Sequence, residues 1–237
     1  RESTMRKRED EDSLKQMLER NSRMHSLKSV ENGRNFLVRE NDVFVSTYPK
    51  SGTTWMQFLS HNVRLVIENE FLDEKKAMQF NEITEKVPWD VLAEDCRSVG
   101  TIGGAQDLRA GQSKTDPKNG LRLFKSHESV RTIAKRKDGA MMARYVIVCR
   151  NPEDVFHSFH QFLPAYCGID PEEITAETFC DAIFAGASHS GQYWEWNMDW
   201  FQFAEKHRER VLMVCFEDMK EDLASVIRKV AKLMGED

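Results

Sequence analysis

The feature that most constrains the fold of this chain is a strand-like segment that runs straight into a tight loop and then into a helix. Residues 42–47 (Asp-Val-Phe-Val-Ser-Thr) have the apolar, β-branched character of a buried strand. Proline and glycine punctuate the loop at residues 48–52 (Tyr-Pro-Lys-Ser-Gly). A helix is predicted from Thr53 onward, because large apolar residues then recur at helical spacing at Trp55, Phe58, Leu59, Val63 and Val66.

Further strands are predicted at residues 121–126, 143–149 and 211–216, of which the second is the most apolar. Each is followed by a helical pattern or a helix signal. Strands that alternate with helices predict an α/β fold with a mainly parallel central sheet flanked by helices.

The helix signals are local. Asn151 suits an N-cap and Pro152 a first helical position, so a helix is predicted to start there. Another is predicted after His127, and a closing amphipathic helix at residues 223–233, ended by Gly235.

Ligands of parallel sheets bind beyond the carboxyl ends of the strands. The most informative positions are therefore the residues just after each predicted strand, which are Lys50, His127, Arg150 and Glu217.

Composition narrows the function. A net charge of −5 gives no general positive field, which argues against nucleic acid and membrane surfaces as partners. The five cysteines are scattered and include no CxxC pair, so reduced thiols are expected. No apolar run is long enough to span a membrane, and the N-terminus has no apolar core of a signal peptide. The predicted location is the cytoplasm.

The chain is predicted to comprise a charged N-terminal segment, 1–28, and a single domain, 29–237. The first segment predicts one weak amphipathic helix and is given no catalytic role. Between about 71 and 120 glycine accumulates and periodicity fades, which is typical of a long loop region that serves as a lid or binding loop.

The loop at residues 50–54 (Lys-Ser-Gly-Thr-Thr) has the parts of an anion-binding site: a glycine, two hydroxyls, one lysine and the free N–H groups of a helix start. It is not a Walker A sequence, because its lysine precedes the only glycine, which argues against a kinase or NTPase. The alternative is an ordinary strand-to-helix turn. His157 and His160 have no partners at ligand spacing, so no metal site is predicted.

With its flanking residues, Tyr48 to Trp55, this loop resembles the 5′-phosphosulfate loop of the cytosolic sulfotransferases, which use 3′-phosphoadenosine-5′-phosphosulfate (PAPS). Two more segments match in order. Residues 125–127 (Lys-Ser-His) are similar to the family's Lys-Thr-His, and residues 149–158 are similar to its 3′-phosphate motif. Residues 216–220 (Phe-Glu-Asp-Met-Lys) match a later segment. The resemblance covers roughly residues 36 to 235 and implies the P-loop-NTPase-like sulfotransferase fold.

The resemblance also implies roles. The 5′-phosphate and sulfuryl group are assigned to Lys50, Ser51, Gly52, Thr53 and Thr54. Adenine is assigned to Trp55, and the 3′-phosphate to Arg150 and Ser158. The resemblance also implies a bond by which Ser158 restrains Lys50. Arginine offers a phosphate the bidentate fork that lysine lacks. Taken alone, Trp55 could equally be a core residue on the inner face of its helix.

His127 is the predicted general base, because transfer to a hydroxyl or amine requires removal of the acceptor proton. Lys50 and Lys125 are predicted to stabilise the negative charge that develops. Trp89, in a Val-Pro-Trp segment similar to one of the family, is assigned as an acceptor contact. The alternative for His127 is a surface or structural histidine. The alternative for Trp89 is a buried loop anchor.

The chain departs from the family pattern at two places. Ser190 stands where the family has a tyrosine on the adenine side, with Tyr193 close enough to substitute. The family's C-terminal segment, Arg-Lys-Gly-x-x-Gly-x-Trp-Lys, is not found before Asp237, so the domain is expected to be C-terminally incomplete. The dimerisation motif belongs to the same region, and no oligomeric state is predicted.

The sequence therefore predicts a PAPS-dependent sulfotransferase that acts on a small-molecule acceptor without a metal. The alternative is a catalytically weak or inactive nucleotide-binding protein of the same fold. The acceptor is not predicted.

Overall fold

The computed structural model describes residues 2–23, 25, 27–35, 38–68, 80–91, 120–134 and 142–235. The predicted acceptor loops at 71–120 therefore lie largely outside the described residues.

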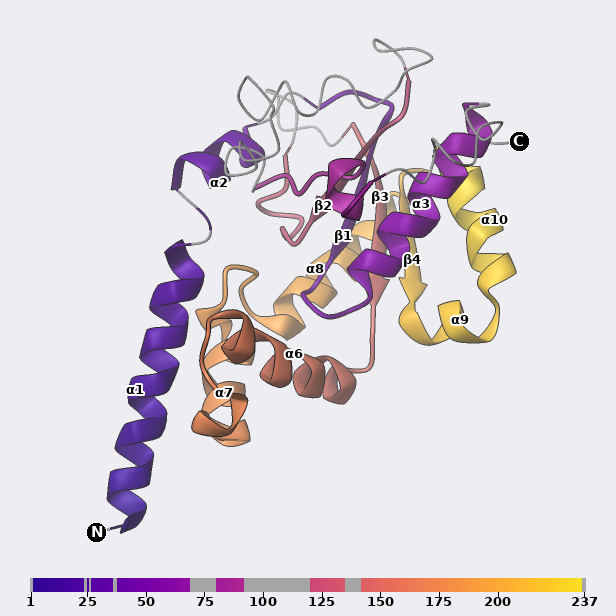
Figure 1. Ribbon diagram of the computed structural model, residues 1–237. Coiled ribbons are helices and arrows are strands. Elements are labelled where there is room, and N and C mark those ends of the chain that lie inside the picture. Colours follow the sequence, from indigo (N-terminus) through magenta and orange to yellow (C-terminus); the bar gives the residue numbers. More distant parts are fainter. Residues whose placement is uncertain are drawn as a thin grey trace.

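The centre of the fold is a four-stranded sheet (Figure 1). Its strands are β1 (Asp42–Thr47), β2 (Arg122–Ser126), β3 (Arg144–Cys149) and β4 (Val211–Cys215), in the spatial order β2-β1-β3-β4. All three strand pairs are parallel, with Phe44 between Phe124 and Tyr145 in the register. The predicted α/β fold with a mainly parallel sheet is confirmed.

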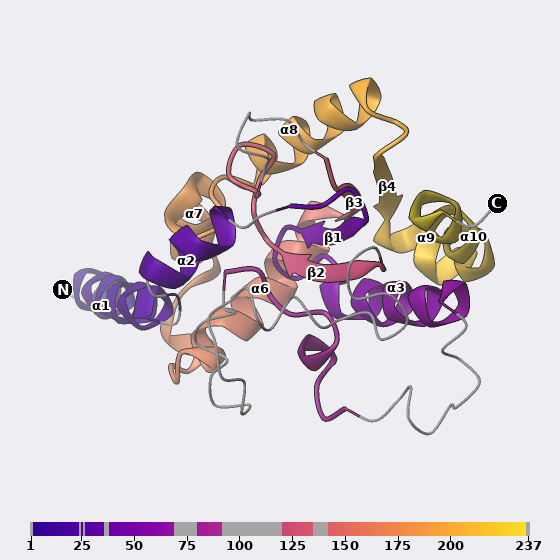
Figure 2. The same cartoon turned by 90° about the horizontal axis from the view of Figure 1, so that it is seen from above.

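Both faces of the sheet are covered, because successive side chains of a strand point to opposite sides. Val43 and Val45 face a core formed with α3 (Thr53–Ile67) and α10 (Leu223–Met234). Phe44 faces a second core, formed with α6 (Pro152–Tyr166), α7 (Ala176–Ala182) and α8 (Tyr193–Lys206). Figure 2 shows α3 and α8 on opposite sides of the sheet.

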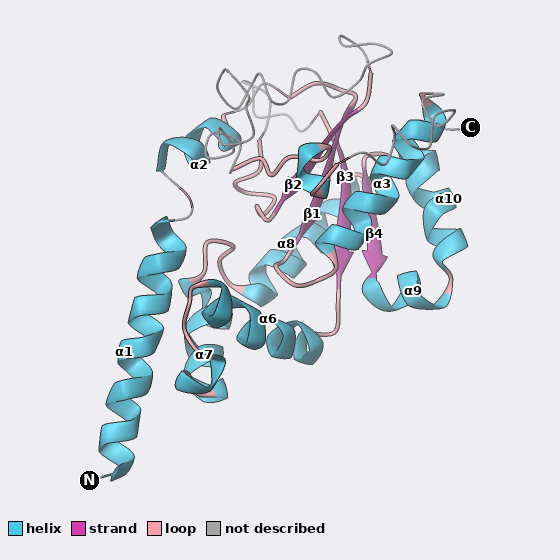
Figure 3. Ribbon diagram, viewed as in Figure 1, coloured by secondary structure: helices cyan, strands magenta, loops and turns pink. Residues whose placement is uncertain are grey.

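Shorter elements connect these layers. They are α2 (Leu27–Arg34), η1 (Ile83–Glu85), η3 (Pro171–Glu173), the π-helical η4 (Ile183–Ala187) and α9 (Phe216–Glu221). The loop after β1, α6 and α9 all lie at the carboxyl edge of the sheet (Figure 3). No helix in the described part of the chain is both long and apolar enough to cross a membrane.

The predicted helix signals hold with one exception. Asn151 caps α6, its Oδ1 accepting hydrogen bonds from the backbone N–H groups of Glu153 and Asp154, and Gly235 ends α10 with φ 106°. The helix expected after His127 is wrong over residues 127–134, which form a turn closed by bonds from the N–H groups of 132 and 133 to the Ser129 carbonyl.

The N-terminal segment forms α1 (Glu2–Arg23), which is bound to the domain by specific contacts. Met17 is fully buried in the core shared with α6 and α7. The Asp10 carboxylate accepts hydrogen bonds from the backbone N–H and hydroxyl of Thr175, at 2.8 and 2.7 Å, and from the Thr178 hydroxyl at 2.6 Å. Arg20 donates to the carbonyls of Cys167 and Gly168 at the end of α6. These contacts fix α1 against η3 and α7 and against the C-terminal end of α6.

We expect Asp10→Ala to loosen α1, because it removes the acceptor of three hydrogen bonds. Hydrogen bonds to a charged group contribute about 1.5–3 kcal/mol, so amide exchange in residues 9–23 should accelerate by about tenfold or more. Hydrogen exchange followed by mass spectrometry measures this. Asp12→Ala, at an exposed position of the same helix, is the matched control. Unchanged exchange in Asp10→Ala would show that the carboxylate does not hold α1.

Candidate active site

The loop between β1 and α3 has an unusual backbone. Lys50 has φ 70° and Gly52 has φ 101°, both in the left-handed region. A lysine in this region is uncommon, and such outliers gather at functional sites. Below the loop, the Thr47 and Thr53 hydroxyls are 2.6 Å apart, and the Ser51 N–H donates to the Tyr48 carbonyl at 3.2 Å. The loop is thus held closed at the start of α3.

Gly52 allows a close approach by an aromatic ring. A β-carbon at this position would lie 2.5 Å from Cδ2 of Phe216, the residue directly after β4. The Phe216 ring also contacts Trp55 edge-on, at 5.8 Å between ring centres, and lies 4.6 Å from Cζ of Arg150. The ends of β1, β3 and β4 therefore meet around one ring.

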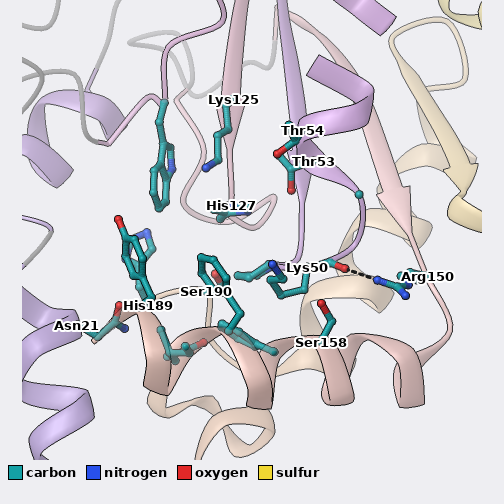
Figure 4. A pocket seen from close by; sticks show the side chains of 18 of the residues that line it. Asn21, Lys50, Thr53, Thr54, Lys125, His127, Arg150, Ser158, His189 and Ser190 are labelled. Atoms are coloured by element: carbon teal, nitrogen blue, oxygen red, sulfur yellow. Dashed lines mark hydrogen bonds between the residues drawn. The ribbon is translucent and has the colours of Figure 1, made fainter. Parts of the chain in front are cut away.

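Arg150, the first residue after β3, connects two strand ends. Its Nη1 donates to the Lys50 carbonyl at 3.0 Å (Figure 4). Nη2 lies 3.6 Å from Oδ2 of Asp154, and Nε is buried without a hydrogen-bond partner among the described residues. The guanidinium therefore has one donor without a partner in the described part of the chain, which the binding of an anion could use.

The Lys50 ammonium lies 3.8 Å above the centre of the Phe162 ring, which comes from α6. Burial, and then the nearby Arg150, lower the pKa of Lys50 below its ordinary value. Within the described part of the chain no hydrogen bond joins Lys50 to Ser158, although both side chains face the same space (Figure 4). An anion at this position would relieve the repulsion between the two cations.

His127 is fixed in one tautomer. Its Nδ1 lies 2.8 Å from the Thr47 carbonyl, which can only accept, so Nδ1 carries the proton and Nε2 is the basic nitrogen. The Trp196 indole N–H donates to the His127 carbonyl at 3.1 Å and holds the backbone. Burial, and then the charge of Lys125, keep the pKa of His127 well below 6.5. The imidazole is therefore neutral at pH 7 and able to accept a proton.

Trp89 is held next to β2 by its backbone. Lys125 donates its N–H to the Pro88 carbonyl, and the Asp90 N–H donates to the Lys125 carbonyl, both at 2.9 Å. The Lys125 ammonium lies 3.8 Å from the centre of the Trp89 ring, and the His127 ring meets that indole edge-on at 4.9 Å. Lys125, His127 and Trp89 thus form one cluster.

These groups surround one cavity of about 580 Å³. The predicted site residues that line it are Lys50, Gly52, Thr53, Thr54, Trp55, Trp89, Lys125, His127, Arg150 and Ser158. Ser51 is the exception, because it is only 1% exposed beneath the loop. No group of three or more potential metal-ligating side chains occurs among the described residues.

The sequence did not reveal several lining residues. Asn21 and His25 come from the segment that was given no catalytic role, His189 comes from the turn before α8, and Phe216 is the first residue of α9. Only Phe216 had a signal, as the last residue of the strand predicted at 211–216 and the first of the matching segment 216–220. Tyr193 is buried and donates its hydroxyl to the Arg150 carbonyl at 2.9 Å, whereas Ser190 lines the cavity.

A family profile described as "Sulfotransferase domain" matches residues 40–237. Sulfotransferase 1 family member D1 of Rattus norvegicus is 32% identical over 208 residues, which cover 85% of this chain and 61% of the rat protein. Flavonol 3-sulfotransferase of Flaveria bidentis is 26% identical over 200 residues, which cover 84% of this chain and 58% of the Flaveria protein. The chain thus spans about 60% of the length of these relatives.

Solved structures share the fold. Retinol dehydratase in complex with retinol and PAP superposes with a TM-score of 0.59 at 22% identity, over 89% of this chain and 64% of that protein. A putative steroid sulphotransferase of Arabidopsis thaliana also has a TM-score of 0.59, at 18% identity. The match covers 89% of this chain and 75% of the Arabidopsis protein.

We expect Gly52→Ala to destabilise the domain by about 2–4 kcal/mol, through left-handed backbone strain and the clash with Phe216. Gly191→Ala is the matched control, because Gly191 also has positive φ but nothing lies within 4 Å of its added carbon. That control should cost about 1 kcal/mol. Urea unfolding measures both. In a Phe216→Ala background the cost of Gly52→Ala should fall to that of the control; an unchanged cost would contradict the proposed contact.

Proposed function

This chain belongs to the sulfotransferase family, and we propose that it transfers the sulfuryl group of PAPS to a hydroxyl or amine of a small-molecule acceptor. The observation that carries the proposal is the meeting of the left-handed loop at 50–52, Arg150 and His127 in one cavity. The cavity alone would fit many phosphorylated ligands, and family membership favours a nucleotide that carries a sulfuryl group. The proposed location of the protein is the cytoplasm, as for the relative named cytosolic sulfotransferase 1.

The residues at the strand ends fit a doubly phosphorylated nucleotide. The loop at 50–54 offers backbone N–H groups, two hydroxyls and an ammonium to the 5′-phosphosulfate. The 3′-phosphate is assigned to Arg150 and Ser158, which lie on the side of Lys50 away from Thr53 and Thr54 in Figure 4. The buried, unpartnered Nε of Arg150 supports this assignment, because a phosphate oxygen would satisfy it. Trp55 and Phe216 supply flat faces for adenine.

PAPS supplies an activated sulfuryl group. The protein's side chains are proposed to accept the acceptor's proton and to stabilise the negative charge that develops. Nε2 of His127 takes up the proton of the acceptor's hydroxyl or amine. The bond from Nδ1 to the Thr47 carbonyl keeps Nε2 unprotonated and basic. Lys50 and Lys125 stabilise developing negative charge on either side of the reacting centre. Burial strengthens both effects, because the local dielectric constant is low.

We expect His127→Ala to reduce sulfuryl transfer by about 10²–10⁴-fold, because the general base is lost. The dissociation constant for 3′-phosphoadenosine 5′-phosphate (PAP) should change by less than about threefold, since no nucleotide contact is assigned to His127. Transfer of radiolabelled sulfate across phenols, alcohols, steroids and amines measures the first, and calorimetry measures the second. His207→Ala, a half-exposed histidine at the end of α8, is the control.

Two results would contradict the proposal. A His127→Ala variant that keeps most of its activity would remove the histidine from the mechanism. Absence of PAP binding by the unaltered chain would defeat both the sulfotransferase and the inactive nucleotide-binding protein.

A further inference from the structure

The cavity has two chemically different ends. Arg150 and Ser158 lie at one end, whereas Asn21 and His189 lie at the other (Figure 4). Lys125 and His127 stand between them. Since the nucleotide is assigned to the first end, the second end is left for the acceptor.

Ring side chains line the acceptor end. The His25 ring meets Trp89 edge-on at 4.8 Å between centres and stacks on His189 at 4.9 Å. Because the His127 ring lies 4.9 Å from the same indole, a molecule of one or two rings can reach from the base to His25. Phe162 and Tyr166 of α6 also line the cavity. Aromatic walls of this kind favour a flat ring.

Buried charge pairing fixes this end of the cavity. Glu128, directly after the proposed base, lies with Oε1 2.8 Å from Nε2 of His189 and with Oε2 2.9 Å from Nε of Arg34. Burial alone would raise the pKa of Glu128, but the bonds from His189 and Arg34 outweigh it and lower the pKa to about 2. His189 therefore lies against an ionised carboxylate that is also paired with Arg34.

His25 has a ring nitrogen that no polar group among the described residues bonds. Its Nδ1 is buried with no hydrogen-bond partner in the described part of the chain. Burial, and then His189 and Lys125, lower the pKa of His25 to about 4, so the imidazole is neutral and offers one donor and one acceptor. Because no group in the described part of the chain bonds Nδ1, the ring can turn a nitrogen toward a ligand. A ligand hydroxyl would complete its hydrogen bonding.

We propose that His25 is a specificity-determining residue, and that it selects planar aromatic alcohols with a second hydroxyl remote from the one that reacts. The inference rests on the proposed function, because it places the acceptor in the same cavity. His25 follows α1, so the contacts of Asp10, Met17 and Arg20 with the domain help to build the acceptor site.

The test is equilibrium binding of 2-naphthol and 2,6-dihydroxynaphthalene to the full chain saturated with PAP, measured by naphthol fluorescence. The unaltered protein should bind the diol about tenfold more tightly, as one additional hydrogen bond provides. The diol can bind in two equivalent orientations, which doubles its apparent affinity. This factor is the same for every variant and cancels when their affinity ratios are compared.

Three variants separate hydrogen bonding from packing. His25→Phe keeps a ring and should abolish the preference for the diol, while the affinity for 2-naphthol changes by less than about threefold. His25→Gln keeps a donor and an acceptor and should retain part of the preference. His207→Phe, remote from the cavity, should behave as the unaltered protein. Thermal unfolding checks that each variant is folded.

The inference is overturned if the unaltered protein shows no preference, if His25→Phe keeps it, or if both naphthols weaken equally in His25→Phe. Should His25→Phe not fold, a His25→Gln variant that loses the preference completely would also overturn it. The ratio of kcat/KM for the two naphthols with PAPS provides a second readout. A preference in binding that depends on His25, without any transfer, would defeat the proposed function and leave this inference standing. Sulfuryl transfer without a preference for the diol would support the proposed function and overturn this inference.

Discussion

The site depends on the hydrogen bond from the Arg150 guanidinium to the Lys50 carbonyl. It joins the end of β3 to the loop after β1 and supports Lys50 in a left-handed conformation that side chains other than glycine rarely adopt. Lys50 can then aim its ammonium over Phe162 and into the cavity. Together with the bonds of Thr47 and Ser51 that close the loop, this bond positions two cationic groups that are proposed to bind the nucleotide.

The electrostatic consequence is an excess of positive charge in a partly desolvated space. Lys50, Lys125 and Arg150 all line the cavity, and the pKa of Lys50 is lowered by burial and by Arg150. The carboxylates nearby are already engaged, Asp154 with Arg150 and Glu128 with Arg34 and His189. A polyanionic ligand would therefore stabilise the site, whereas His127 remains a neutral base held by the Thr47 carbonyl.

The sequence predicts what short-range chemistry determines. The strand, loop and helix at 42–67 and the Asn151 cap of α6 depend on neighbouring residues, and both are found where expected. The end of the cavity proposed for the acceptor depends on contacts between distant segments: Asp10, on the helix that precedes His25, binds Thr175, far away in the sequence. The helix wrongly expected after His127 has a similar cause, since Trp196 and Trp200 donate to the carbonyls of 127 and 128 and hold that backbone in a turn.

The most direct test of the account is calorimetry with PAP and with adenosine 5′-phosphate, which lacks the 3′-phosphate. The unaltered chain should bind PAP about thirtyfold or more tightly than the monophosphate, because Arg150 pairs with the second phosphate. In Arg150→Lys most of that difference should disappear, since lysine lacks the bidentate fork, and affinity for the monophosphate should also fall, because the bond that supports the loop at Lys50 is weakened. Equal affinity of the unaltered chain for the two nucleotides would contradict the proposed site.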